Sequence, residues 1–143
     1  MGFKGQAKDL NGNNELLQLW WHVGQTIHTR RSQEAWGTNV LDRLARDLRT
    51  EFPTMKGFSA ANLRYMRRFA EAWPDLDAIR QRPVGELPWG HVIELLDKLD
   101  DQEQRDWYAA KDAHHGWSRP VLAHQITTKL HEREAAAPTN FAG

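Results

Sequence analysis

Apolar residues recur at three- and four-residue spacing along most of the chain, which is typical of amphipathic helices. The pattern predicts an all-α fold, a compact bundle of about six or seven helices. The first helix is expected at residues 14–31, with Leu16, Leu19, Trp20, Val23 and Ile27 as its buried stripe. The other helices are expected at about 38–52, 59–73, 75–82, 89–99, 101–115 and 118–136.

The two ends of the chain differ in composition from the predicted helical domain, residues 14–136. Residues 1–13 are rich in Gly and Asn, and we expect them to form a flexible lead-in. Residues 137–143, which contain Pro138, look like the start of a linker. One domain of 143 residues is long enough to bury a shared core.

The stretch from Trp36 to Trp73 predicts two helices joined by a tight corner. Ser59 is placed to cap the second helix, and Gly57 gives the corner backbone freedom. At 100° per residue this helix has an apolar side formed by Leu63, Met66, Ala70 and Trp73, and an opposite side that carries Arg64, Arg67, Arg68 and Glu71. One packed side and one cationic side indicate a helix-turn-helix.

A similar arrangement recurs later in the chain. Gly116-Trp117-Ser118 repeats the glycine, aromatic and serine of Gly57-Phe58-Ser59, and a Trp-Gly pair opens a helix before each corner. The helix before the second corner is expected to turn Trp107, Ala110 and Ala113 inward. The repeat suggests duplicated helix-turn-helix-like units near residues 37–73 and 89–136. The alternative is that glycine, aromatic and serine are simply good chemistry for starting a helix.

Charge is sorted along a chain whose net charge is zero. Residues 37–73 hold seven Lys or Arg against four Asp or Glu, whereas residues 74–112 hold five against ten. Binding to nucleic acid would therefore depend on a local basic surface. There is no cysteine, no apolar run of membrane-spanning length and no signal-peptide pattern, so we expect a cytoplasmic protein with no membrane partner.

Six ordered motifs carry a family resemblance: WWHVGQTI, WGTNVLDRLARDLRTEFP, GFSAANLRYMRRF, LPWGHVIELLDKL, GWSRPVLAHQI and TNF. Together they resemble the amino-terminal domain of the bacterial YhcG-type family of PD-(D/E)XK nucleases. The resemblance implies a helical, DNA-binding domain that precedes a separate carboxy-terminal nuclease domain. The motif at residues 139–141 is similar to the family's junction between the two, so the nuclease domain is expected to lie outside this sequence.

The residues themselves also argue against catalysis within the chain. A PD-(D/E)XK site needs metal-binding carboxylates and a lysine two residues after one of them. No lysine here follows Asp or Glu at that spacing; the lysines are Lys4, Lys8, Lys56, Lys98, Lys111 and Lys129. The histidines lack metal-ligand spacing, and glycine-rich phosphate loops are absent. We therefore expect no enzyme activity, no metal and no cofactor.

Two functions remain open. The first is a DNA-binding module that targets or assembles a nuclease, on double-stranded or branched DNA. Its candidate contacts are Arg64, Arg67, Arg68, Arg43, Arg46, Arg49 and Lys56, and, for the second unit, Arg119, His124 and Lys129. The alternative is a homo-oligomerisation or protein-interaction module without nucleic-acid contact, suggested by seven tryptophans, of which Trp20, Trp21 or Trp107 would lie on an exposed patch. The two are compatible, because dimers present two half-sites.

Overall fold

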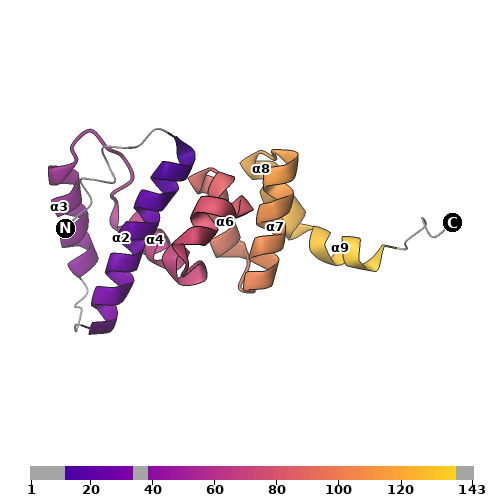
Figure 1. Ribbon diagram of the computed structural model, residues 1–143, viewed down its shortest axis with the longest axis horizontal. Helices are drawn as coiled ribbons and strands as arrows, with labels where there is room; N and C mark the ends of the chain where they lie inside the picture. The colour runs from indigo at the N-terminus through magenta and orange to yellow at the C-terminus, as the bar shows by residue number, and fades with distance from the viewer. Residues whose placement is uncertain (1–11, 34–38, 138–143) are drawn as a thin grey trace.

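Helices make up nearly all of the described chain, which comprises residues 12–33 and 39–137 of a computed structural model (Figure 1). The helices are α2 (Asn13–Gln33), α3 (Val40–Glu51), α4 (Ala60–Ala72), α5 (Leu76–Gln81), the 3-10 helix η1 (Pro83–Glu86), α6 (Trp89–Lys98), α7 (Gln102–His115), α8 (Arg119–Thr127) and α9 (Leu130–Ala136). These residues include no β-strand, so the predicted all-α bundle is confirmed. Within them, no helix has the length and apolar character that crossing a bilayer demands.

Three predicted features fall at the margins of the described chain. The flexible lead-in and the linker lie outside the described residues, apart from residues 12, 13 and 137 at their edges. The first Trp-Gly pair, at residues 36–37, lies outside them as well. These three features stay predictions.

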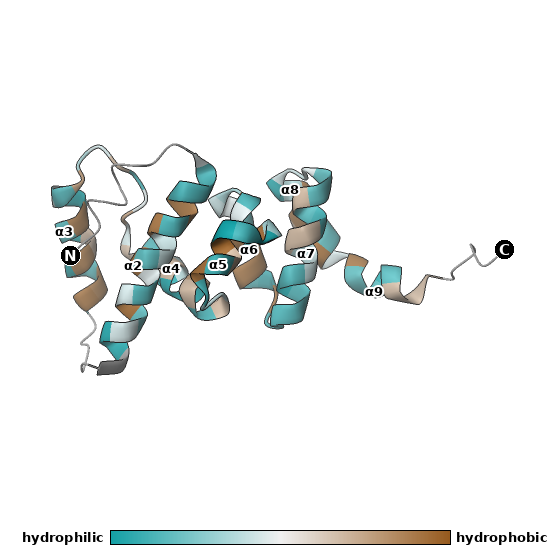
Figure 2. Cartoon of the chain, viewed as in Figure 1, coloured by the Kyte–Doolittle hydropathy of each residue, from teal (hydrophilic) through white to brown (hydrophobic). Residues whose placement is uncertain are grey.

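The contact between α2 and α4 is the most extensive one between two helices of the described chain. A Cβ atom on Gly24 of α2 would come within 1.9 Å of the Met66 carbonyl oxygen of α4, so only glycine permits this approach. Leu63, Met66 and Phe69 of α4 are fully buried, as are Val23 and Ile27 of α2 to within 1%. Apolar and hydrophilic residues share each helix, as Figure 2 shows, and the apolar ones supply this core.

Trp20 and Trp21 are both buried, with 3% and 8% of their surfaces exposed, which corrects the expectation that one of them lies on an exposed patch. They contact residues at opposite ends of α4. The ring of Trp20 packs edge-on against Phe58, just before the helix, and Trp21 Nε1 donates to the Trp73 carbonyl at 2.7 Å, just after it. Because the chain surrounds α2 on more than one side, adjacent residues of that helix are buried together.

The second half of the fold is attached to α2 through α5 and η1. The Asn14 side-chain amide donates to the carbonyl oxygens of Ile79, at 2.6 Å, and Gly85, at 3.0 Å. Asp75 caps α5, and Trp89 opens α6 as expected. From there α6 comes first along the long axis of the molecule, and α7 and α8 lie next, beside each other (Figure 1). The chain is thus one continuous stack of helices, with α3 at one end and α9 at the other.

The two predicted corners have the expected caps but different lengths. Ser59 Oγ accepts from Asn62 N at 3.1 Å, and Ser118 Oγ accepts from Val121 N at 3.3 Å. Residues 52–59 separate α3 from α4, whereas residues 116–118 alone separate α7 from α8. Since a helix-turn-helix corner has about three or four residues, the α7–α8 corner fits that description better.

Two predictions about the last helices are wrong in detail. The helix expected over residues 118–136 is broken at Lys129, which adopts a left-handed backbone conformation (φ 59°) between α8 and α9. On α7, Trp107 and Ala113 are partly buried against the core as expected, but Ala110 is exposed, and Tyr108 and Ala109 are the fully buried residues. Tyr108 faces the last two helices, since its hydroxyl accepts from His131 N at 3.0 Å and donates to the Gln125 carbonyl at 3.4 Å.

We predict that Gly24→Ala lowers the free energy of unfolding by about 3 kcal/mol, because its methyl group would overlap the Met66 carbonyl and force α2 and α4 apart. Urea unfolding followed by circular dichroism measures this. Gly90→Ala is the matched control: its Cβ would meet only the flexible Arg119 side chain, at 3.0 Å, so stability should be kept. Equal stability of the two variants would contradict the tight α2–α4 contact.

Candidate nucleic-acid interface

The three arginines expected to form a cationic side on α4 differ in their surroundings. Arg64 is exposed and makes no hydrogen bond or ion pair with any described residue. Arg67 is paired with Glu71 of the same helix at 3.0 Å, and its side chain is 22% exposed. Arg68 is paired with Asp97 of α6, also at 3.0 Å. On the predicted cationic side of α4, only Arg64 therefore has no carboxylate partner among the described residues.

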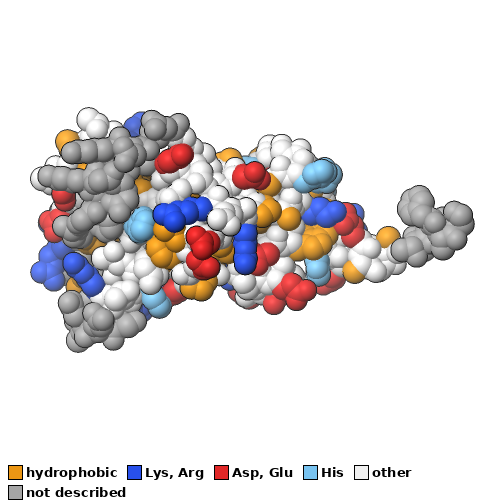
Figure 3. Space-filling model, in the orientation of Figure 1, with side chains coloured by type: hydrophobic (Ala, Val, Ile, Leu, Met, Phe, Trp, Pro, Cys, Tyr) orange, Lys and Arg blue, Asp and Glu red, His pale blue; other side chains and the backbone are white. Residues whose placement is uncertain are grey.

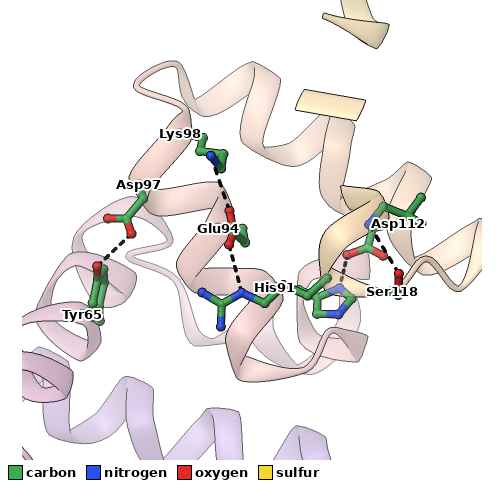
Figure 4. A network of polar contacts seen from close by, with 9 residues as sticks. Tyr65, His91, Glu94, Asp97, Lys98, Asp112 and Ser118 are labelled. Atoms are coloured by element: carbon green, nitrogen blue, oxygen red, sulfur yellow. Dashed lines mark hydrogen bonds and ion pairs between the residues drawn. The ribbon is translucent and has the colours of Figure 1, made fainter. Parts of the chain in front are cut away.

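Arg68 joins α4 to α6 through several contacts. Besides the Asp97 ion pair, its guanidinium donates to the Leu96 carbonyl at 2.5 Å and lies 5.5 Å from the centre of the Tyr65 ring. The Tyr65 hydroxyl donates to Asp97 at 2.8 Å, as Figure 4 shows, and this hydrogen bond is the main reason that the pKa of Tyr65 is raised. These contacts give Arg68 a structural role between helices.

Four candidate cations on α3, α4 and the loop between them are exposed and have no side-chain partner in the described residues. We call them the α3–α4 cations: Arg43, Arg46, Lys56 and Arg64. Arg49 is exposed too, but its Nη1 donates to the Phe58 carbonyl at 2.8 Å and so fastens α3 to the start of α4. On the face drawn in Figure 3, Lys and Arg side chains lie together at the α3 end of the molecule, beside acidic ones.

Two further cations at this end were not predicted. Arg30 and Arg31 are exposed in the last turn of α2, the helix that precedes α3 in the chain. The predicted basic segment begins at residue 37, after the predicted first helix, and so does not include these two arginines. Their position at the end of the predicted first helix could have indicated that they are exposed cations, because basic residues in a last helical turn complement the helix dipole.

The candidate residues of the second unit are less basic as a group. Arg119 Nε donates to Glu94 at 2.9 Å, and Glu94 also lies 4.0 Å from Lys98. His124 and Lys129 are exposed, on α8 and between α8 and α9. The neighbouring carboxylate thus neutralises the one candidate arginine of this unit, and the α3–α4 cations form the stronger candidate surface.

A buried polar pair also escaped prediction. His91 Nδ1 lies 2.6 Å from Asp112 Oδ2, and the two residues are 8% and 2% exposed. Burial raises the pKa of Asp112, while the hydrogen bond and charge of His91 and a hydrogen bond from the Trp117 backbone oppose the rise. His91 comes from α6 and Asp112 from the end of α7, so nothing in local sequence spacing could have paired them.

The His91–Asp112 pair lies beside a pocket formed by the end of η1, α6, α7 and the corner that follows α7. The pocket has a volume of about 430 Å³ and is lined by Glu86, Leu87, Pro88, His91, Asp112, Ala113, Gly116 and Trp117. We call it the corner pocket. Among the described residues, no group of three or more His, Asp or Glu side chains is placed to hold a metal ion.

One family model matches this chain. It is described as the DUF1016 N-terminal domain, and it covers residues 6–133. That family includes YhcG-type proteins, so the resemblance carried by the six sequence motifs is confirmed. No curated protein and no solved structure matches the chain.

We predict that His91→Leu lowers the free energy of unfolding at pH 7 by about 3 kcal/mol, because it leaves the Asp112 carboxylate buried without its partner. The pKa of Asp112 in the folded variant would then stand further above its ordinary value of 3.8. Since the folded variant would hold this proton more tightly than the unfolded chain, the stability should return as the pH falls toward 3.8.

Urea titrations between pH 4 and pH 7 measure this effect. His124→Leu is the control, because His124 is exposed and its side chain has no partner in the described residues. A stability difference between His91→Leu and the wild type that stays constant over this pH range would contradict the role given to the buried carboxylate.

Proposed function

The chain belongs to the DUF1016 N-terminal domain family, and we propose that it serves as a DNA-binding module which positions a nuclease domain on its substrate. The observation that carries this proposal is the set of α3–α4 cations, which are exposed and unpaired among the described residues. Arg30 and Arg31 of α2 would add to the same basic end. The proposal gives this chain no catalytic role of its own.

The proposed contacts are with phosphate groups. Lysine and arginine side chains that are free of acidic partners can release the counterions condensed on DNA, which is the main source of non-specific affinity. Arg67 and Arg68 are already paired with carboxylates of the chain, so α4 offers Arg64 alone as a free guanidinium among its three central arginines. We therefore propose backbone binding, with a dissociation constant of about 10⁻⁴ to 10⁻⁶ M at physiological salt.

The acidic segment, residues 74–112, indicates which side of the molecule the DNA would avoid. Of the ten carboxylates at residues 74–112, Asp97 and Glu94 pair with Arg68 and Arg119. Six others are exposed: Asp75, Asp77, Glu86, Asp100, Asp101 and Glu103. A polyanion would be repelled by that region and attracted to the α3 end. The DNA would thus lie across α3 and the α3–α4 loop.

The oligomerisation alternative is weakened, because Trp20 and Trp21 are buried within the chain's own core. Self-association stays a prediction, and static light scattering measures it directly. A stable oligomer that ignores DNA would favour the interaction module over the DNA-binding one.

The triple variant Arg43→Ala/Arg46→Ala/Arg64→Ala tests the DNA-binding proposal. We expect it to weaken binding to a fluorescent duplex at least tenfold and to flatten the log–log salt dependence by about 0.9 for each phosphate that is no longer neutralised. Because none of the three side chains has a partner in the described residues, the melting temperature should stay unchanged. Fluorescence anisotropy at three salt concentrations provides the measurement.

Arg82→Ala is the matched control, since Arg82 is equally exposed but follows α5 in the acidic segment. It should bind the duplex like the wild type. If the triple variant keeps the wild-type affinity and salt slope, the α3–α4 cations are not the interface.

A further inference from the structure

The end of the loop between α3 and α4 is held by side chains from three helices. Arg49 of α3 donates from Nη1 to the Phe58 carbonyl at 2.8 Å. Asn62 of α4 donates from Nδ2 to the Gly57 carbonyl at 2.7 Å. Trp89 of α6 donates from Nε1 to Asn62 Oδ1, also at 2.7 Å. Two successive carbonyl groups of the loop are thus bonded to side chains, and one of those side chains is itself bonded to α6.

The Asn62 side chain is bonded at both ends of its amide. An indole N–H can only donate and a carbonyl oxygen can only accept, so Oδ1 must face Trp89 and Nδ2 must face Gly57. The Trp89 ring is fixed in turn, because it packs edge-on against the buried Phe69 ring, with centroids 5.3 Å apart. Asn62 therefore links the loop backbone to the core of the fold through two short hydrogen bonds.

Gly57 is held between an aromatic ring and the Asn62 amide. Its φ of 105° favours glycine, and a Cβ atom at this position would lie 3.1 Å from the buried Trp20 ring. Lys56 directly precedes Gly57, and its exposed side chain has no partner among the described residues. The Lys56 side chain therefore starts from a backbone position that other residues fix.

We propose that Asn62 is a positioning residue for DNA: by holding Gly57, it keeps Lys56 where it contacts a phosphate group, and it makes no contact with the DNA itself. This inference rests on the proposed DNA binding and adds to it a residue without charge. The physical reason is conformational freedom. A lysine on a loosely held loop must be ordered as the DNA binds, which weakens binding, whereas a lysine on an ordered loop loses less freedom.

Asn62→Ala tests this role, because it removes both side-chain hydrogen bonds and changes no charge. We expect the variant to bind a fluorescein-labelled duplex about fivefold more weakly than the wild type in fluorescence anisotropy. Asn14→Ala is the matched control. Asn14 is also a partly buried asparagine near the start of a helix, but the carbonyl oxygens to which it donates belong to Ile79 and Gly85, in the acidic segment. This control should lose stability and bind the duplex like the wild type.

A double-mutant cycle with Lys56→Ala separates positioning from a general loss of stability. Lys56→Ala alone should weaken binding by a similar factor and flatten the log–log salt dependence by about 0.9, the value for one phosphate. In the Lys56→Ala background, Asn62→Ala should then have no further effect on the affinity, because the contact that Asn62 supports is already absent. A general loss of stability would instead lower the affinity in both backgrounds.

Trp89→Phe provides a second test at the other end of the Asn62 amide. Phenylalanine keeps a ring against Phe69 but has no N–H group for Asn62 Oδ1. We expect weaker binding to the duplex, and again no further effect when Lys56 is replaced by alanine. The backbone ¹⁵N order parameter of Gly57 reports the positioning directly: it should be about 0.85 in the wild type and fall toward about 0.6 in both variants.

The outcomes separate this inference from the proposed function. If Asn62→Ala weakens binding equally with and without Lys56, or if Asn14→Ala weakens it as much, Asn62 acts through stability alone and the inference is refuted. Wild-type affinity in both Asn62→Ala and Trp89→Phe would refute it as well. In each of these cases the wild type still binds the duplex, and the proposed function stands. If the wild type does not bind the duplex at all, both are overturned.

Discussion

The approach of α2 to α4 at Gly24 is the constraint on which the other helices depend. With no side chain at this position, the two backbones touch, and α4 is fixed both along its length and about its axis. In this orientation of α4, Arg68 and Tyr65 point toward Asp97 on α6. Trp73, just after α4, donates from its Nε1 to Asp106 of α7 at 2.8 Å. The close packing is also unfavourable in one respect, because Arg67 Nε in the same helix is buried without a partner.

Some of the acidic residues at 74–112 form ion pairs with arginines of the chain, and these arginines are then less available to a ligand. Carboxylates from the acidic segment neutralise arginines on neighbouring elements, as Asp97 does for Arg68 and Glu94 does for Arg119. These partly exposed pairs each contribute about 0–1 kcal/mol, and their main effect is to remove cations from the surface. The α3–α4 cations stay free at the α3 end, far along the sequence from most of the acids. Net neutrality therefore conceals a basic end at α3 and an acidic middle at residues 74–112.

Features set by local chemistry could be predicted from the sequence, and features set by distant contacts could not. Ser59, Ser118 and Gly116 act as caps because a helix end needs them whatever lies nearby. The ion pairs Arg68–Asp97 and His91–Asp112 each join two different helices. Neither pair could be predicted from the spacing of residues within one helix. The inward position of Tyr108 on α7 could not be predicted for the same reason, because its hydroxyl contacts His131 N on another helix, α9. Four candidate cations therefore proved to be held by contacts within the chain: Arg49, Arg67, Arg68 and Arg119.

Lys129, whose backbone is left-handed, turns the chain between α8 and α9 and so sets the direction in which α9 leaves the other helices. No residue of α9 is buried, and α9 points away from the stack in Figure 1. Leu130 and His131, at its start, still pack against the body, but beyond them its attachments are polar, such as the ion pair between Lys111 and Glu134 at 3.0 Å. Arg133 of α9 reaches back across this turn and donates to the Thr128 carbonyl at 2.9 Å, so polar contacts, and not the hydrophobic core, set the direction of the far end of α9.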